Sequence, residues 1–145
     1  MRRSEHNCIG RTVHKAVREA LVNCLVNADF YLPQGIVIKK NVNSLVIENP
    51  GSIRIGKKQM LLGGVSDPRN KNLMKMFNLL GIGERAGGGI PDIYQVWADQ
   101  GWNSPVVEEF YNPDRTRLSL DFRPKQAKKT SEENKRRKQA KKNGG

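Results

Sequence analysis

The chain has 145 residues, of which 26 are lysine or arginine and 14 are aspartate or glutamate, for a formal net charge of +12. This length allows one modest hydrophobic core, and no apolar run approaches the ~20 residues that a membrane-spanning helix needs. The two cysteines have no metal-binding spacing. We therefore expect a single-domain protein without membrane association, reduced and cytoplasmic.

The positive charge is concentrated at the C-terminal end. Residues 123–145 contain ten lysines and arginines against two glutamates, whereas the preceding 122 residues have 16 basic and 12 acidic side chains. A segment with so few apolar residues cannot bury enough surface to offset the entropy lost on ordering. We predict an N-terminal arm at 1–11, a folded domain at 12–122 and a disordered basic tail at 123–145.

The first predicted element is an amphipathic helix. Apolar residues recur at helical spacing from Val13 to Ala28, and Thr12 can cap the first turn. Residues 35–40 and 44–48 then have the composition of two short strands that form a hairpin. The Asn-Pro-Gly sequence that follows predicts a turn centred on the proline, beyond which we expect Ser52 and its neighbours up to Ile55 to extend one strand.

Two further helices and a strand complete the domain. Apolar spacing over residues 73–80 predicts a helix ended by Gly81, and a later helix starts near Ile90 and ends at Gly101. Residues 117–122 alternate between apolar and polar and predict a final strand. The order helix, hairpin, helix, helix, strand indicates an α/β (α+β) two-layer sandwich, with the helices on one face of a small mixed sheet.

A polar stripe follows the first helix. Glu19, Asn23 and Asn27 are spaced four residues apart, so they share one face that lies beside the apolar one. A carboxylate and two amides at the edge of a core must find hydrogen-bond partners. A bound ligand would supply them, and hydrogen bonds between the helix and neighbouring loops would supply them equally well.

A glycine-rich turn precedes the last helix. Glycines stand at 81, 83 and 87–89, just before Ile90. Glycines allow backbone N–H groups to converge on a ligand, and a helix N-terminus favours negative charge. A phosphate would fit there with help from Arg85; the alternative is a flexible connection between two helices. The sequence has no Walker-type or Rossmann-type spacing.

Taken in order, residues 18–30, 47–51, 68–73 and 83–90 resemble a known family. They are similar to the C-terminal domain of transcriptional regulators labelled RecG-related ATP-dependent helicases. That domain is grouped with the GHKL (Bergerat-fold) ATPases, such as gyrase, Hsp90, histidine kinases and MutL. The resemblance covers about residues 12–122, and it implies a Bergerat-like fold that binds ATP with Mg²⁺.

The resemblance also implies roles for single residues. Glu19 matches the glutamate that activates water in hydrolysing members of the family, and Asn23 matches the asparagine associated with Mg²⁺. The further candidates for cofactor binding are Asn27, Asn49, Gly51, Gly83, Arg85, Gly87, Gly88 and Gly89.

Two departures from the family pattern keep two functions open. The first glycine box of the family reads Asp-x-Gly-x-Gly, and its aspartate accepts a hydrogen bond from adenine; this chain has Asn49, Pro50 and Gly51 instead. Asn27 stands where relatives commonly carry histidine. One function is an ATP-binding regulatory module, with ATPase activity left open. The other is a non-catalytic Bergerat-fold domain for dimerisation or protein contacts. Helicase activity by this chain alone is not expected, because it has no motor motif.

The basic tail predicts contacts with nucleic acid. Each phosphate neutralised by lysine or arginine releases counterions, which gives sequence-independent and salt-sensitive affinity. A solvated tail without a partner is the alternative. The family usually has a DNA-associated AlbA/Schlafen-like domain before this one, so the resemblance implies the C-terminal piece of a larger regulator that acts with DNA. The candidate DNA contacts are Lys135, Arg136, Arg137, Lys138, Lys141 and Lys142.

Overall fold

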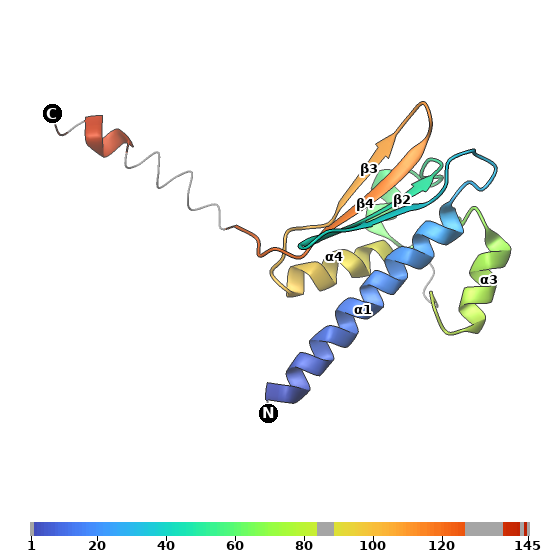
Figure 1. Ribbon diagram of the computed structural model, residues 1–145, viewed down its shortest axis with the longest axis horizontal. Coiled ribbons are helices and arrows are strands. Elements are labelled where there is room, and N and C mark those ends of the chain that lie inside the picture. Colours follow the sequence, from blue (N-terminus) through green and yellow to red (C-terminus); the bar gives the residue numbers. More distant parts are fainter. Residues whose placement is uncertain (1, 84–88, 127–137, 143, 145) are drawn as a thin grey trace.

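The computed structural model describes residues 2–83, 89–126, 138–142 and 144 of the chain. The elements of the domain are α1 (Arg2–Asn27), β1 (Val37–Lys40), β2 (Ser44–Pro50), α2 (Lys57–Leu62), α3 (Lys71–Leu79), α4 (Gly89–Asp99), β3 (Val106–Phe110) and β4 (Arg115–Asp121). Within the described residues, four strands form one sheet in the order β1-β2-β4-β3. Figure 1 shows α1 and α4 against one face of this sheet, with α3 on the far side of α1.

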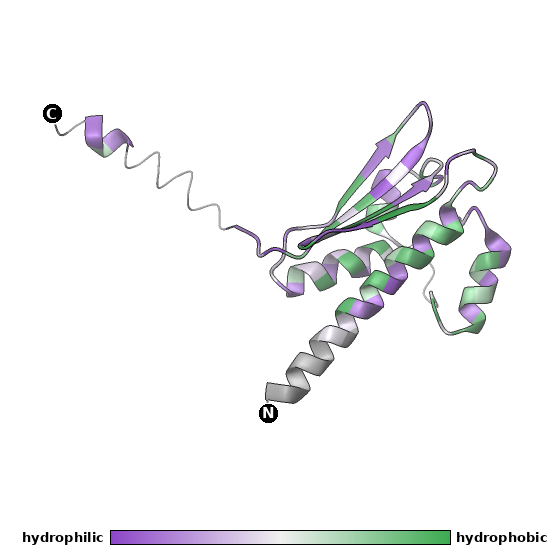
Figure 2. Ribbon diagram, in the orientation of Figure 1, coloured by the Kyte–Doolittle hydropathy of each residue, from purple (hydrophilic) through white to green (hydrophobic). Residues whose placement is uncertain are grey.

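The core lies between the sheet and the pair formed by α1 and α4. Leu45 and Ile47 of β2 stand opposite Leu120 and Leu118 of β4, and all four are buried on the face toward the helices. The strand period of two therefore produces one apolar face. Figure 2 shows apolar residues along α1 and α4, the two helices that lie against the strands. The buried side chains that the helices add to this core are Ala16, Ala20, Cys24, Ile90, Ile93 and Trp97.

The predicted two-layer α/β architecture is confirmed, but the sheet is antiparallel rather than mixed. Each described neighbouring pair of strands runs in opposite directions. Two hairpin pairs, β1 with β2 and β3 with β4, account for the outer contacts, since short connections require antiparallel neighbours. The central pair β2–β4 is also antiparallel, so no parallel crossover is formed among the described strands.

The first helix begins ten residues earlier than the capping pattern predicted. α1 starts at Arg2 instead of Thr12 and continues to Asn27. The preceding residues contain no proline, and extending an existing helix is much easier than nucleating one. Gly10 in its interior costs about 1 kcal/mol relative to alanine, which is too little to end it. Among the described residues, no helix is long and apolar enough to cross a membrane.

The predicted Asn-Pro-Gly turn is displaced by one residue. Asn49 and Pro50 remain in β2, where Pro50 pairs with Arg115, and the chain leaves the sheet only at Gly51, with φ +102°. Proline is tolerated at this strand end because it needs no acceptor for a backbone N–H. The expected strand over 52–55 is absent. The Ser52 carbonyl oxygen accepts a hydrogen bond from the Arg69 side chain, and the Ile53 N–H donates to the Glu109 side chain. Neither backbone group is therefore paired with a strand.

The other predicted elements are confirmed, but the sequence patterns missed two elements that the structure contains, β3 and α2. The hairpin, the helix before Gly81, the helix before Gly101 and the last strand all form where the pattern places them. β3 was missed because it is an edge strand with Glu108 and Glu109, and acidic residues are depleted in strands. α2 was missed because it is six residues long and has no buried residue.

Candidate functional site

A cavity of about 100 Å³ lies between α1, the end of β2 and the segment that joins β2 to α3. Its lining comes from residues far apart in the chain, because α1, β2 and β4 all reach this end of the molecule. The residues that line it are Glu19, Val22, Asn23, Val26, Asn27, Asn49, Ser52, Ile53, Arg54, Ile55, Met60, Val65, Ser66, Asp67, Pro68, Met74, Gly83, Gly89, Ile90 and Thr116.

The polar stripe of α1 forms one wall of this cavity. Glu19, Asn23 and Asn27 are half-buried and line it together, as their spacing predicted. From the first to the last of them, the helix rises about 12 Å. The cavity therefore has a carboxylate at one end of this wall and an amide at the other, with the buried Val22 and Val26 beside them.

Glu19 meets both ends of the glycine-rich turn. The backbone N–H of Gly83 donates to Glu19 Oε1 at 3.3 Å, and a β-carbon at Gly89 would lie 4.0 Å from Oε2. Gly83 has φ +72°, a backbone conformation that favours glycine, and its α-carbon packs beside the terminal methyl group of Met74. The structure thus joins the two motifs that the sequence predicted separately.

Part of the predicted glycine turn cannot be placed. Arg85, Gly87 and Gly88 lie outside the described residues. Gly83 and Gly89, which flank them, do line the cavity, and Gly89 is the first residue of α4.

The two asparagines of α1 are held differently. Asn27 Nδ2 donates to the carbonyl oxygen of Asn23 within the same helix, at 2.9 Å. For Asn27, the simpler alternative of local hydrogen bonding therefore holds. No other described residue hydrogen-bonds the side-chain amide of Asn23, which faces the cavity.

Asn49 closes the end of the cavity nearest the sheet. Asn49 is only 8% exposed to solvent, and its Nδ2 donates to the carbonyl oxygen of Pro50 at 3.1 Å. Asn49 pairs across the ladder with Thr116, which also lines the cavity and donates from Oγ1 to the carbonyl oxygen of Gly51 at 2.9 Å. Gly51 itself is not among the lining residues. Sequence reasoning missed Thr116 because only the β2–β4 register brings it beside Asn49.

Arg69 and Asn70 fasten the connecting segment to the C-terminus of α1. Asn70 Nδ2 donates to the carbonyl oxygens of Leu25 at 3.1 Å and Ala28 at 2.8 Å, and its backbone N–H donates to Val26. The last carbonyls of a helix have no partners within it. The motif at 68–70 therefore caps a helix more than 40 residues away in sequence.

Arg69 links two backbone carbonyls and one side-chain carboxylate rather than lining the cavity. Its Nε donates to the carbonyl oxygen of Asn27 at 3.2 Å, its Nη2 donates to that of Ser52 at 3.1 Å, and its Nη1 lies 3.8 Å from Asp29 Oδ2. Gly51 packs against the same guanidinium, since a β-carbon there would lie 3.2 Å from Arg69 Nη2. All of these guanidinium contacts hold parts of the fold together.

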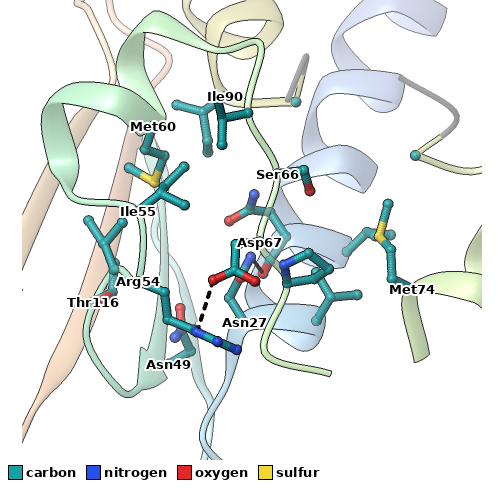
Figure 3. A pocket seen from close by; sticks show the side chains of 18 of the residues that line it. Asn27, Asn49, Arg54, Ile55, Met60, Ser66, Asp67, Met74, Ile90 and Thr116 are labelled. Carbon is teal, nitrogen blue, oxygen red and sulfur yellow. Dashed lines mark hydrogen bonds and ion pairs between the residues drawn. The ribbon is translucent and has the colours of Figure 1, made fainter. Parts of the chain in front are cut away.

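Arg54 and Asp67 form an ion pair at the cavity that sequence reasoning did not find. Arg54 Nε lies 3.2 Å from Asp67 Oδ2, and both side chains line the cavity. Figure 3 shows them facing one another on the side where Asn27 and Asn49 lie, away from Ile90. No periodicity or motif marks either residue, so only the folded chain reveals the pair.

None of the predicted nucleic-acid residues that the structure describes lines this cavity. Lys135, Arg136 and Arg137 lie outside the described residues, and Lys138, Lys141 and Lys142 are exposed in the helical segment 138–142. Backbone hydrogen bonds tie the chain to the domain as far as Lys125, whose N–H donates to the carbonyl oxygen of Gly101 at 2.8 Å. In the described part of the chain, no three His, Cys, Asp or Glu side chains gather as a metal site would require.

Comparison with solved structures supports the fold. The DIP2311 protein from Corynebacterium diphtheriae has a similar crystal structure, with a TM-score of 0.64 and 23% sequence identity. The match covers 74% of this chain and 23% of that chain, so this chain corresponds to about a quarter of that protein. No curated protein matches the sequence.

Comparison with protein families is more specific. The family described as "Putative ATP-dependent DNA helicase recG C-terminal" matches residues 34–120. The matched range includes the sheet, the flanking segments of the cavity and the glycine-rich turn, and it begins after α1. Because the match spans well over half of the chain, this protein belongs to the family of RecG-type C-terminal domains.

Proposed function

We propose that the domain binds an adenine nucleotide with Mg²⁺ in the cavity beside α1 and serves as an ATP-binding regulatory module of the GHKL type. The observation that carries this proposal is the shape of the site. A carboxylate and the glycine turn meet at one end, at Glu19 and Gly83, while the amide of Asn49 closes the other. The family description, which names an ATP-dependent protein, supports the choice of nucleotide.

The chemistry of the lining fits the three parts of a nucleotide. Val22, Val26, Ile53 and Met60 offer apolar walls for the faces of a base. Asn49 offers both a donor and an acceptor for its polar edge. At the opposite end, the N-terminus of α4 suits phosphate oxygens, because the first N–H groups of a helix and the helix dipole favour anions.

Mg²⁺ would neutralise phosphate charge and hold the phosphates in position. Asn23 is the residue of α1 that would assist, since its side-chain oxygen is a hard ligand and the amide faces the cavity. Glu19 is the group available to take a proton from water, so hydrolysis would depend on Glu19 while binding would not. We propose binding as the function and treat turnover as a separate property to be measured.

A regulatory role follows from the position of the cavity. Its lining unites α1, the sheet and the segment that leads to α3, so a ligand contacts each of them at once. A nucleotide would therefore change how these parts pack, and a neighbouring domain would detect that change. This chain corresponds to about a quarter of its structural neighbour. We propose that the rest of a larger DNA-associated protein receives the signal.

Binding is tested by titrating Mg²⁺-ATP and Mg²⁺-ADP into the protein, followed by calorimetry and by NMR chemical shifts. We expect shifts at Glu19, Asn23, Asn49, Gly83 and Gly89. Asn49→Ala should lower affinity about tenfold, the usual effect of removing a buried hydrogen-bonding group. The matched control is Asn43→Ala, an exposed asparagine in the turn just before β2.

The control should bind like the unaltered protein. No response at millimolar nucleotide would overturn the proposal. It would instead support the alternative of a domain that keeps this fold for dimerisation or protein contacts.

A further inference from the structure

The end of the sheet opposite the cavity carries a group of basic side chains. β2 begins at Ser44 at this end and reaches Asn49 at the cavity, a rise of about 17 Å. β4 runs the other way, so its last residue, Asp121, pairs with Ser44. The turn between β1 and β2 therefore lies beside the residues that follow β4. Figure 1 shows these residues leaving the sheet on the side away from α3.

Backbone contacts hold the residues that follow β4 onto the domain. The Asn103 N–H donates to the carbonyl oxygen of Arg123 at 3.0 Å, and the Lys125 N–H donates to that of Gly101 at 2.8 Å. Both acceptor and donor on the domain side belong to the loop that follows α4. The backbone of these two basic residues is therefore fixed, although the apolar pattern of the sequence ends before them.

The β1–β2 turn places two lysines beside this segment. The Phe122 N–H donates to the carbonyl oxygen of Asn43 at 2.9 Å, and Lys40 Nζ lies 5.8 Å from the centre of the Phe122 ring. Lys39 precedes it and points to the other face of the sheet, as successive strand residues do. Both lysines are exposed. We call Lys39, Lys40, Arg123 and Lys125 the basic end.

Little negative charge offsets the basic end. Arg123 forms an ion pair with Asp121, at 2.6 Å between Nη2 and Oδ2, and its side chain is still 64% exposed. Among the described residues, no carboxylate forms an ion pair with any of the three lysines. Asp99, the last residue of α4, accepts a hydrogen bond from Gln95. Three positive charges at this end are therefore open to an external anion.

An aromatic cluster makes the basic end rigid. Trp97 is fully buried, and the rings of Trp97, Trp102 and Phe122 contact one another with centroids 5.4–5.6 Å apart. Trp97 Nε1 also donates to the carbonyl oxygen of Asp121 at 2.8 Å. These contacts tie the end of β4 to α4 and to the loop behind it. Charges on such a fixed scaffold lose less conformational freedom on binding than charges on a free chain.

We propose that the basic end contacts the phosphate backbone of double-stranded DNA and that the basic tail continues this contact. Lysine and arginine neutralise phosphates and release counterions, so the contact is independent of sequence. β1 and β4 are separated by one strand, which spaces the cations at their ends about 10 Å apart. That distance spans about three base pairs. The cations lie on both faces of the sheet end, which suits a narrow row of phosphates better than a flat membrane.

The first test compares two double variants of the full chain. Lys39→Ala with Lys40→Ala removes two charges from the basic end, whereas Lys57→Ala with Lys58→Ala removes two from exposed positions in α2. Anisotropy of a fluorescein-labelled DNA duplex is measured at several salt concentrations. We expect the slope of log affinity against log salt to fall by about 1–2 in the first variant and by less than about 0.5 in the second. Lys39→Gln with Lys40→Gln keeps more of each side chain and should match the alanine pair.

The second test locates the DNA by NMR chemical shifts of the unaltered full chain. The basic end predicts shifts at the indole N–H of Trp102 and at the backbone N–H groups of Gly101 and Lys125, because these groups adjoin the cations. A contact made by the tail alone predicts shifts confined to residues after 126. Neither test uses a nucleotide, so the outcome is independent of the function proposed for the cavity.

The outcomes decide both the surface and its partner. A loss of slope confined to the Lys39 and Lys40 variants, together with shifts at Trp102, supports the proposal. Equal loss in the α2 control overturns it, because the effect then follows net charge rather than position. Shifts confined to the tail also overturn it. Vesicles that contain phosphatidylglycerol are the comparison for the partner, and tighter binding to them than to DNA at the same salt concentration would overturn the choice of nucleic acid.

Discussion

Glu19 Oε1 accepts a hydrogen bond from the backbone N–H of Gly83 at 3.3 Å, across 64 residues of sequence. This contact joins the polar face of α1 to the start of the glycine-rich turn. It also uses an N–H that would otherwise be available to a phosphate. The side-chain carboxyl group of Glu19 thus stands at the glycine end of the cavity.

We expect Glu19→Ala to accelerate hydrogen exchange of the Gly83 amide about fivefold, because the variant removes the acceptor of this hydrogen bond. Glu19→Gln retains a side-chain oxygen and should keep most of the protection. Amide exchange measured by NMR checks both variants. Equal rates in all three proteins would show that the contact does not restrain the turn.

The same glutamine variant separates binding from turnover. A glutamine cannot take a proton from water, so we expect any ATP hydrolysis to fall by about 100-fold or more in Glu19→Gln. Its affinity for Mg²⁺-ADP should stay within about threefold, because the hydrogen-bonding shape is preserved. Steady-state turnover and calorimetry measure the two quantities. Turnover that persists in the variant would exclude Glu19 as the base.

The capping contacts of Asn70 should be important for stability. Asn70→Ala leaves the carbonyl oxygens of Leu25 and Ala28 without their side-chain donor. We expect a loss of about 1–3 kcal/mol in the free energy of unfolding, measured by urea denaturation. Asn72→Ala, at an exposed position in the first turn of α3, is the matched control and should change stability by less than about 0.5 kcal/mol. Equal effects of the two substitutions would contradict the capping role.

Glu48 should make the domain sensitive to acid. Burial favours a higher pKa, but hydrogen bonds from Arg115 and Arg117 outweigh it and hold the pKa of Glu48 below its usual value. The unfolded chain therefore takes up a proton first as pH falls, so this stabilisation is complete at neutral pH and decreases below about pH 5. Because the Glu48 side chain is only 14% exposed, Glu48→Gln should cost about 1–3 kcal/mol at pH 7.

Urea denaturation at a series of pH values checks this prediction. The difference between Glu48→Gln and the unaltered protein should shrink as the pH falls below about 4. Glu108→Gln is the control, because Glu108 is 46% exposed and lies 3.9 Å from the same Arg117. A difference that stays constant from pH 7 to pH 3 would show that charge is not the cause.

Cys24 should be chemically inert in the folded domain. Burial, only partly opposed by the charge of Arg115, raises the pKa of its thiol to about 11. The reactive thiolate is therefore scarce at pH 8. In a Cys8→Ser background, we expect a disulfide reagent to modify Cys24 at least about 100-fold more slowly than in urea. Equal rates with and without urea would show that the thiol is accessible in the native state.

The basic tail should supply most of any nonspecific affinity for DNA. Truncation after Gln126 removes eight lysines and arginines but keeps the Lys125–Gly101 backbone hydrogen bond. We expect the full chain to show a steep fall of log affinity with log salt, about 0.9 per phosphate contacted, and the truncated chain to lose most of that slope. Fluorescence anisotropy at several salt concentrations measures both slopes. Unchanged binding after truncation would place the DNA contact in the folded domain.

Much of the fold could be predicted from local patterns. The spacing of apolar residues on α1 and α4, and the alternation on β4, identify each element and its buried face, because these periods repeat within a few residues. The same periodicity placed Glu19, Asn23 and Asn27 on one face, and all three do line one cavity. Elements without a buried face, such as α2, carry no such signal.

The rest of the fold and of the cavity depended on contacts between residues that are distant in sequence. The sequence alone determined which side chains share a helix face and which glycines can turn the chain, since both are properties of a few neighbouring residues. Only the tertiary structure decided that Thr116 stands beside Asn49, that Asn70 caps α1 and that Arg54 meets Asp67. Such contacts arise when strand register and helix packing bring remote segments together, and no short-range pattern encodes them.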